Sequence, residues 1–333
     1  MPTTTVVIPN YNGMKFLPAC MESLMKQDYK DFTILMIDNA SADGSADWMS
    51  EHYPFVPLIR NNENLGFSGA VNQGISLSET PYVILLNNDV EVDPGYVGAM
   101  VRAIESDPRI FSVSAKMIRF YERDMIDDAG DLMNLIGWAF QRGIARDVKL
   151  YEKDMVPVFS ACAGAAIYRK EVFDRIGMFD PMHFAYLEDL DVGYRARLYG
   201  YRNVYCSKAV VYHVGSGTSA DGNKYSDFKV KTAARNSIYV LYKNMPLLQL
   251  IWNFFPLLLG YLLKLSFFKK RGFGDAYREG LKEGFAKRKE CKKVPFSFTR
   301  IGNYIVIQWM LFTGMIIYTW EYLHRKHSKS NSW

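Results

Sequence analysis

Apolar runs and amphipathic stretches alternate along the first hundred residues of the chain. The run at residues 32–37 shows no polar alternation, as expected for a strand that is buried on both faces of a sheet. The expected strands lie at residues 6–9, 32–37, 56–60 and 82–86, and the expected helices at 16–27, 46–52 and 66–77. Repeated strand–helix units of this kind predict an α/β fold with a mostly parallel, doubly wound, Rossmann-like sheet.

The pattern changes twice further along the chain. Residues 107–214 mix short strands with one helix around 189–199. After residue 243 two long apolar runs appear, 247–268 and 301–320, with eleven basic and four acidic residues at 269–300. We therefore predict an α/β domain at residues 1–243 and an apolar, basic helical region at 244–333.

The charge of the chain is unevenly distributed. The net charge is +5, but residues 241–333 carry 16 Lys/Arg against 5 Asp/Glu, and residues 1–240 carry 24 against 30. Basic residues beside apolar runs suit an anionic membrane surface, whereas an acidic body does not suit nucleic acid. The four cysteines show no CxxC pair, and no secretory signal is recognisable, which favours a cytosolic location.

The run at 247–268 is long enough to cross a membrane, for which roughly 20 residues are needed. Its interior is interrupted by four residues, Gln249, Asn253, Pro256 and Lys264. If both apolar runs spanned a membrane, the basic segment between them would lie outside, against the usual distribution of charge. We therefore expect helices that lie in the cytoplasmic interface of the cell membrane. The alternatives are membrane-spanning helices, a soluble helical domain and a contact between copies of the chain.

Polar side chains follow the ends of the predicted strands, where ligands of doubly wound sheets bind. Asp89 ends a buried strand and could hold a divalent cation against a diphosphate, or cap the following turn. Asp38 could accept hydrogen bonds from a base or ribose, or likewise cap a turn. These positions predict a nucleotide site at this edge of the sheet.

Three acids stand close together before the helix at 189–199. Glu188 and Asp189 are flanked by apolar residues, which favours a raised pKa and a role as general base. Together with Asp191 they could also simply complement the helix dipole. His213 follows a strand, and a single histidine of this kind is more often structural than a metal ligand.

Short motifs in a fixed order connect these positions. The first are VVIPNYNG at 6–13, DNASADGS at 38–45, NNENLGF at 61–67 and LNND at 86–89. The later ones are ACAGAA at 161–166, GMFD at 177–180, EDLD at 188–191 and YH at 212–213. Over roughly residues 4–243 this order and spacing resembles glycosyltransferase family 2, and more narrowly its bacterial rhamnosyltransferase-type members.

The resemblance implies a GT-A fold, an inverting mechanism and a role for each matching residue. The nucleotide-sugar residues would be Pro9, Asn10, Asp38, Asn64, Gly66, Asn87, Asn88 and Gly164. The metal ligands for Mg²⁺ or Mn²⁺ would be Asp89 and His213, and the catalytic residues Asp189, as general base, and Glu188. Asn87 stands where the family usually has the first acid of an Asp-x-Asp motif, so one anionic contact is missing.

The expected activity is metal-dependent transfer of a sugar, with rhamnose favoured, from a dTDP- or UDP-linked donor. The acceptor would be a lipid-linked or other glycan in cell-surface polysaccharide assembly. A nucleotidyltransferase is an alternative, but it would carry a Gly-rich, basic phosphate loop where this chain has Pro9–Gly13. A catalytically degenerate sugar- or lipid-binding scaffold is a second alternative, suggested only by Asn87.

Overall fold

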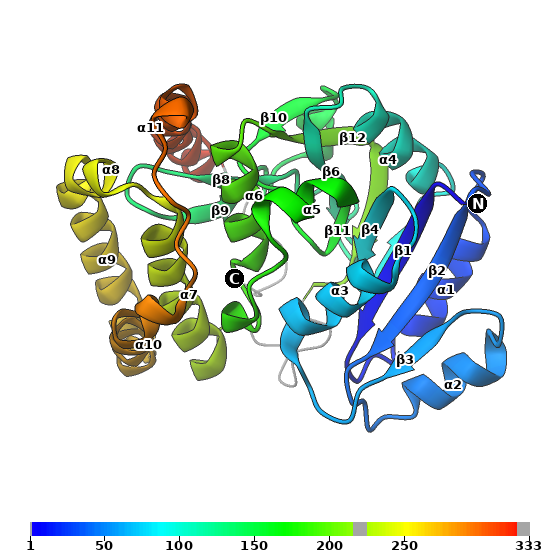
Figure 1. The fold of residues 1–333 in the computed structure, drawn as a ribbon. Helices are drawn as coiled ribbons and strands as arrows, with labels where there is room; N and C mark the ends of the chain where they lie inside the picture. The colour runs from blue at the N-terminus through cyan, green and yellow to red at the C-terminus, as the bar shows by residue number, and fades with distance from the viewer. Residues whose placement is uncertain (1, 216–224, 325–333) are drawn as a thin grey trace.

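The computed structural model describes residues 2–215 and 225–324. Its centre is a ten-stranded sheet with the main order β10-β12-β6-β11-β4-β1-β2-β3, in which β5 also pairs with β12 and β7 with β6 (Figure 1). The strands are β1 Thr4–Asn10, β2 Phe32–Asp38, β3 Leu58–Arg60, β4 Tyr82–Leu86, β5 Val90–Val92, β6 Ile110–Arg119, β7 Ile126–Asp128, β10 Val156–Val158, β11 Ala165–Arg169 and β12 Arg202–His213. A separate hairpin consists of β8 Asp131–Met133 and β9 Ala139–Gln141.

The N-terminal half of the sheet is parallel, as predicted. Strands β3, β2, β1 and β4 pair side by side in one direction, and their register sets Asn10 opposite Asp38. The helices of this half are α1 Leu17–Met25, α2 Ser45–His52, α3 Gly66–Leu77 and α4 Tyr96–Glu105. The apolar residues of these strands are buried, because helices cover both faces of the sheet.

The other half of the sheet is mixed, so the expectation of a mostly parallel sheet is wrong there. Strand β11 is inserted antiparallel between β4 and β6, while β12 runs parallel to β6. Strands β10, β5 and β7 add further antiparallel pairs. Local apolar patterning indicates that a segment is a strand, but it does not indicate the direction of a partner that is distant in sequence.

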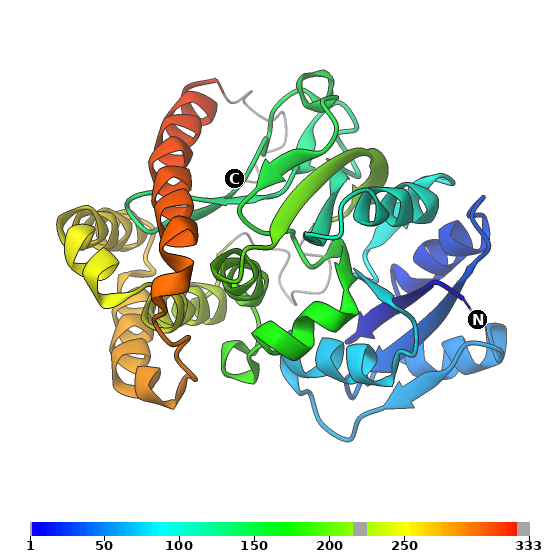
Figure 2. The same cartoon turned by 45° about the horizontal axis from the view of Figure 1, so that its top comes forward.

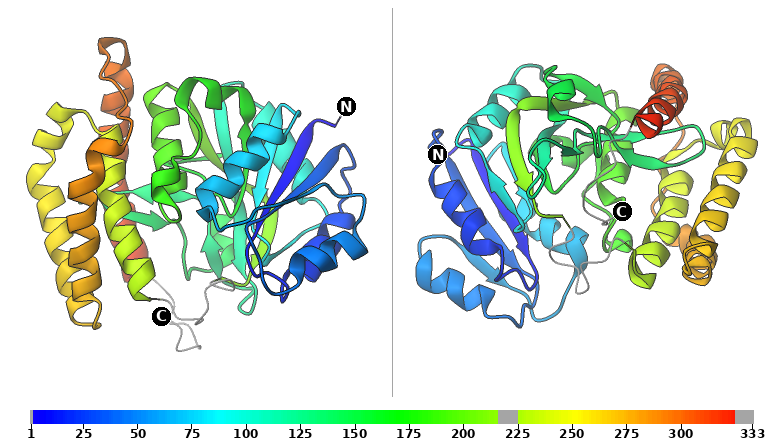
Figure 3. Two further views of the ribbon diagram at one scale, coloured as in Figure 1. Left: turned by 60° about the horizontal axis from the view of Figure 1, so that its bottom comes forward. Right: turned by 180° about the vertical axis from the view of Figure 1, so that it is seen from behind.

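The C-terminal helices gather on the side of the molecule opposite to the N-terminal strands (Figures 1 and 3). They are α7 Asp227–Asn244, α8 Leu247–Trp252, α9 Phe254–Lys269, α10 Gly274–Lys287 and α11 Ile301–Leu323. The apolar run at 247–268 is two helices, because the chain turns at Asn253. Asn253 and Gln249 both hydrogen-bond to Gln308 of α11, so these interrupting polar groups satisfy one another between helices.

Helices α9 and α11 hold the β8–β9 hairpin between them. A Cβ atom at Gly260 of α9 would collide with the carbonyl of Ile136, and one at Gly314 of α11 with that of Met133. Trp138 Nε1 also donates to the Gly260 carbonyl at 3.0 Å. Only glycine permits so close an approach of a helix to another backbone, so these two positions fix the hairpin against the helices.

Helix α11 runs along the body as one long rod (Figure 2). Asn303 near its start donates to Leu198 O at 3.0 Å, and Glu321 near its end accepts from Gly143 N at 3.0 Å. By length and composition, one helix of the described residues, Phe298–Leu323, could cross a membrane. The outer faces of α8, α9 and α11 are strongly apolar, and Trp252 and Phe255 are each 78% exposed.

Candidate active site

The ends of β1, β2 and β4 form one polar network. Asn10 Nδ2 donates to Asp38 Oδ1 at 2.8 Å and to the hydroxyls of Ser41 and Ser45 at 3.0 and 2.9 Å. Asn10 Oδ1 accepts from Asn88 Nδ2 at 2.6 Å. Asp38 also accepts from Ser41 N, so it caps the turn as well as facing the strand ends. The predicted residues Asn10, Asp38 and Asn88 are therefore brought together.

Asn64 and Gly66 lie beside this network at the start of α3. Asn64 Oδ1 accepts from Asn39 Nδ2 at 2.8 Å and from Gly66 N at 2.9 Å. Asn39 follows Asp38 directly, so the turn after β2 and the turn before α3 are joined through it. Pro9, half-buried in β1, precedes Asn10 and makes no side-chain hydrogen bond of its own.

Asp89 and His213 are adjacent because β5 pairs antiparallel with the end of β12. His213 lies opposite Val90, and its Nε2 is 3.5 Å from Asp89 Oδ1. Its other nitrogen, Nδ1, lies 2.6 Å from Asp127 Oδ2. Burial disfavours the charged imidazole, but the two carboxylates outweigh burial and raise the pKa of His213 to about 10. We call Asp89, Asp127 and His213 the histidine cluster.

Asp189 occupies the first turn of α6 Glu188–Leu198. Its Oδ1 accepts from Leu190 N at 2.7 Å and its Oδ2 from Ala163 N at 3.3 Å. Burial raises the pKa of Asp189, although these backbone hydrogen bonds act in the opposite direction. Burial, with repulsion from Asp189, also raises the pKa of Glu188 to about 8.

Gly164 connects the acids of α6 with the end of β4. Its carbonyl accepts from Asn87 N at 2.8 Å, and it follows Ala163, which donates to Asp189. Asn87 therefore lies at the junction between the strand that leads to Asp89 and the segment that holds Asp189. The predicted residues Asn87 and Gly164 are in contact with one another.

The loop before α6 has an unusual backbone. Phe184, Tyr186 and Leu187 all have positive φ, at 60°, 70° and 65°. Asn236 of α7 holds this loop, since its Nδ2 lies 2.9, 2.8 and 2.7 Å from the carbonyls of His183, Ala185 and Tyr186. Strained backbone persists where surrounding structure imposes it, and it commonly does so at functional sites.

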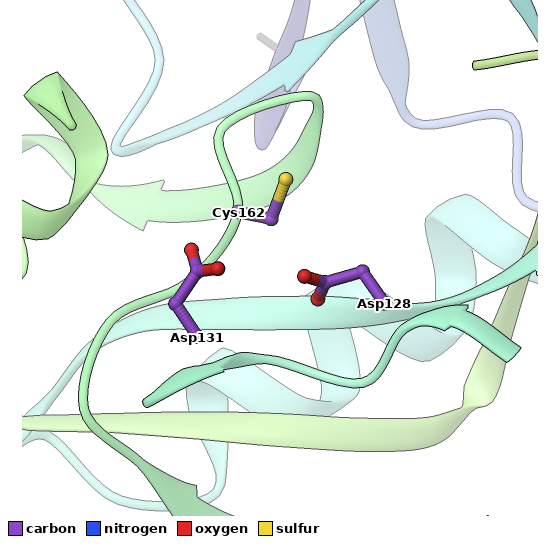
Figure 4. Close-up of side chains that lie close together, drawn as sticks. All are labelled: Asp128, Asp131 and Cys162. Atoms are coloured by element: carbon purple, nitrogen blue, oxygen red, sulfur yellow. The ribbon is translucent and has the colours of Figure 1, made fainter. Parts of the chain in front are cut away.

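Three acids of the site are absent from the sequence prediction of catalytic and metal residues. Asp127 belongs to the histidine cluster, while Asp128 and Asp131 lie near Glu188 and Asp189. Asp128, Asp131 and Cys162 point toward one another, with potential ligand atoms all within 4.8 Å (Figure 4). The signal in the sequence was three acids in five residues, Asp127 to Asp131, around a glycine.

The buried carboxyl groups of Asp128 and Asp131 have few hydrogen-bond partners to offset the cost of their burial. One carboxylate oxygen of each is buried without a hydrogen-bond partner among the described residues. Burial, together with repulsion from Asp127 and Asp189, raises the pKa of Asp128 to about 7, against a hydrogen bond from Gly130 N. Burial and repulsion from Asp128 also raise the pKa of Asp131 well above its usual value. Asp128, Asp131, Glu188 and Asp189 form what we call the acidic cluster.

The site thus combines three different chemical environments at one edge of the sheet. The strand ends of β1 and β2 offer amide and carboxylate groups that match a nucleoside. The histidine cluster offers one imidazole and two carboxylates, and the acidic cluster offers carboxylates that hold protons near neutral pH. Such a set can bind a nucleotide and move a proton from a hydroxyl group.

Two of the curated relatives that this chain resembles are glycosyltransferases. The mycobacterial N-acetylglucosaminyl-diphospho-decaprenol L-rhamnosyltransferase (Mycobacterium tuberculosis) is 28% identical over 240 residues, 65% of this chain and 78% of that protein. The uncharacterized glycosyltransferase YibD of Escherichia coli is 37% identical over 107 residues, 31% of each chain. These relatives favour a glycosyltransferase over the nucleotidyltransferase alternative.

Two solved structures share the fold. GalNAc-T7 with UDP, GalNAc and Mn²⁺ has a TM-score of 0.59 at 16% identity, covering 93% of this chain and 58% of that chain. The mannosyltransferase PcManGT from Pyrobaculum calidifontis in complex with GDP-Man and Mn²⁺ has a TM-score of 0.53 at 14% identity, covering 98% and 88%. These similarities identify the fold as GT-A. Because residues 5–177 also match the profile of Glycosyl transferase family 2, the chain belongs to that family and is a glycosyltransferase.

Proposed function

We propose that the protein is an inverting, divalent-metal-dependent transferase that moves rhamnose from a nucleotide donor to a polyprenyl-linked acceptor. The observation that carries this proposal is the joint position of the histidine cluster and Asp189. Asp128 links them, since its carboxyl interacts electrostatically with both Asp189 and His213. A leaving diphosphate and an attacking hydroxyl need such groups on opposite sides of the sugar.

The donor nucleotide would lie over the ends of β1 and β2. Asn10 and Asp38 are held rigid by the network with Asn88, which preorganises them for the base and ribose. Asn64 and Gly66 would border the same nucleotide, with Pro9 beneath it. Asn87, Asn88 and Gly164 would line the path from the nucleotide to the sugar.

The histidine cluster fits a hard divalent cation, Mg²⁺ or Mn²⁺. Asp89 would supply an oxygen and His213, after loss of its Nε2 proton, would supply Nε2. Asp127 would accept a hydrogen bond from Nδ1–H and so fix the ring orientation. A bound cation would neutralise charge on the leaving diphosphate. The metal-bound GT-A structures support this assignment by fold.

Asp189 would act on the acceptor. With its pKa raised by burial, it takes the proton from the acceptor hydroxyl as the hydroxyl oxygen attacks the anomeric carbon. Attack opposite to the leaving group inverts the configuration at that carbon. Glu188, Asp128 and Asp131 would accept hydrogen bonds from the remaining hydroxyl groups of the acceptor sugar.

We base the choice of sugar and acceptor on the mycobacterial relative, whose name specifies L-rhamnose transfer to a decaprenol-linked substrate. A lipid-linked acceptor agrees with the exposed apolar faces of α8, α9 and α11. Helix α11 contacts the body near both of its ends, which supports a position along the membrane surface. We place the protein at the cytoplasmic face, where its basic residues would meet anionic lipids.

The test is donor hydrolysis by the purified protein over a panel of dTDP-, UDP- and GDP-sugars. We expect Mn²⁺-dependent release of dTDP from dTDP-rhamnose, lost in Asp89→Ala and retained in the matched control Asp124→Ala. Asp127→Asn should raise the Mn²⁺ concentration needed by about 10- to 100-fold. Equal turnover in EDTA would refute metal dependence, and preference for another donor would refute rhamnose.

A further inference from the structure

A cavity of about 180 Å³ lies between the catalytic body and the C-terminal helices. Its walls come from β8, β9 and the loop between them, from the region of Leu187 and Leu190, and from α7 and α9. Eight of its nine lining residues carry no charge, and the ninth is Lys264. The cavity is smaller than the roughly 300–1,000 Å³ typical of sites that enclose a whole ligand, so it suits one end of a longer molecule.

Lys264 has no anionic partner in the part of the chain that the structure describes. Its ammonium group lies 5.5 Å from the ring centroid of Trp138, a cation–π contact. Burial alone shifts its pKa, which falls to about 8, and no carboxylate acts on it. An uncompensated cation in an apolar site is costly, and such residues generally have a partner or a function.

The other interruptions of the same apolar run are accounted for. Gln249 and Asn253 hydrogen-bond to Gln308, and Pro256 occupies the first turn of α9, where proline is tolerated. Lys264 alone lies mid-helix without such a role. A lysine that only extends to the membrane surface would not border a cavity in the protein.

The cavity lies directly behind the acidic cluster. Leu187 and Leu190 flank Glu188 and Asp189 in the chain, and Met133 is at the other end of the short strand that begins with Asp131. On its outer side, α9 exposes a row of leucines at positions 258, 259, 262 and 263. The cavity therefore lies between residues that adjoin the acidic cluster in the chain and a helix whose exposed side chains are apolar.

We propose that this cavity, the Lys264 pocket, binds the phosphate-bearing end of an isoprenoid lipid. The lone ammonium group provides the counter-charge for a phosphate, and the apolar walls accept the first carbons of the chain. A free nucleotide does not fit this combination, because it has no hydrocarbon and the polar strand ends lie elsewhere. The inference rests on the proposed function, since it names where a lipid-linked acceptor is held.

The experiment measures binding of farnesyl diphosphate to the full chain in detergent micelles by titration calorimetry. EDTA is present, so that the histidine cluster cannot bind diphosphate through a cation. Lys264→Gln should weaken binding by about tenfold or more, as expected for loss of a charge-assisted hydrogen bond. Lys264→Arg should retain most of it, and Lys269→Gln, exposed at the end of the same helix, should bind as wild type does.

Two further titrations identify the source of the phosphate. If farnesol binds equally to wild type and to Lys264→Gln, the lysine recognises the phosphate and the proposal is supported. If vesicles of phosphatidylglycerol compete with farnesyl diphosphate only in the presence of Lys264, the pocket binds lipid phosphates in general, as a bilayer headgroup would supply them. Indistinguishable affinities of wild type and Lys264→Gln for farnesyl diphosphate would overturn the proposal, provided that both unfold at the same temperature.

Failure of the proposed function would be seen in a different measurement from failure of the Lys264 pocket. It would appear as absence of dTDP-rhamnose hydrolysis by wild-type protein, while the calorimetric result would still decide the pocket. With a lipid-linked acceptor, Lys264→Gln should raise KM for that acceptor and leave KM for the donor nucleotide sugar unchanged. An effect on the donor KM of equal size would contradict a site specific to the acceptor lipid.

Discussion

The first turn of α6 carries two kinds of carboxylate, which differ in the charged groups around them. Asp191 lies among cations, whereas Glu188 and Asp189 have no cationic partner among the described residues. Arg195 donates to Asp191 Oδ2 at 2.8 Å, Lys243 donates to the same oxygen at 2.9 Å, and Asn244 donates to Oδ1 at 2.7 Å. Burial opposes the charge on Asp191, but these partners hold its pKa well below the usual range.

Glu188 and Asp189 show the opposite balance. Backbone N–H groups are the only donors to Asp189 among the described residues, and one oxygen of Glu188 is buried without a partner. Their pKa values are raised accordingly. Asp191 therefore has the environment of a structural ion pair, whereas Glu188 and Asp189 have the environment that the proposed chemistry would need.

The largest effect on catalysis is expected from Asp189→Asn. The amide keeps the shape of the side chain but cannot take a proton, so kcat should fall by about 10²- to 10⁴-fold. Steady-state transfer to a lipid-linked acceptor measures this change. The variant should still fold, because no cation among the described residues pairs with Asp189 and the asparagine loses one of two backbone hydrogen bonds, at about 0.5–1.5 kcal/mol. Retained turnover would remove Asp189 from the mechanism.

Asp191→Asn should lower the stability of the folded protein, in contrast to the catalytic effect of Asp189→Asn. Arg195 would remain buried without its carboxylate, and Lys243 would keep only its pair with Asp180, which costs about 3–5 kcal/mol of unfolding free energy. Urea unfolding of wild type and variant gives the value, with the surface pair variant Glu22→Gln, next to Lys26, as a control that should change little. An effect under about 1 kcal/mol would show that the network contributes no net stability.

The effect expected from Glu188→Gln depends on pH and is smallest at low pH. A carboxyl whose pKa is raised to about 8 in the folded chain, from roughly 4.3 when unfolded, favours folding only while it is protonated. Wild type should therefore lose stability relative to the variant as pH rises from about 4.5 to 8, by at most about 1.4 kcal/mol per pH unit. Unfolding curves at several pH values test this, and parallel pH profiles of the two proteins would contradict it.

The sequence permitted prediction of the parallel half of the fold because its strands are local and wholly apolar. Asn10, Asp38 and Asn88 follow such strands directly, so their convergence follows from the topology of a parallel sheet. The direction of β11 was not predictable, because its pairing with β4 and β6 joins segments about eighty and fifty residues apart. Local periodicity contains no information on such partners.

The unpredicted part of the site has a similar cause. Asp127, Asp128 and Asp131 lie on β7 and β8, which are three residues long each and too short to show a period. Their approach to His213 and Cys162 depends on β6, β12 and the loop before β11, which are distant in sequence. Likewise, the break at Asn253 depends on Gln308, some fifty residues later.

The glycine contacts of α9 and α11 limit how chimeras of this chain with other family members can be built. Gly260 and Gly314 touch the hairpin that begins with Asp131, so the C-terminal helices and an acid of the site are shaped to one another. A chimera that carries foreign C-terminal helices on this body would place side chains where the hairpin backbone now lies. Residues 131–141 would have to be exchanged together with those helices, and the unit that can be transplanted is therefore discontinuous in the chain.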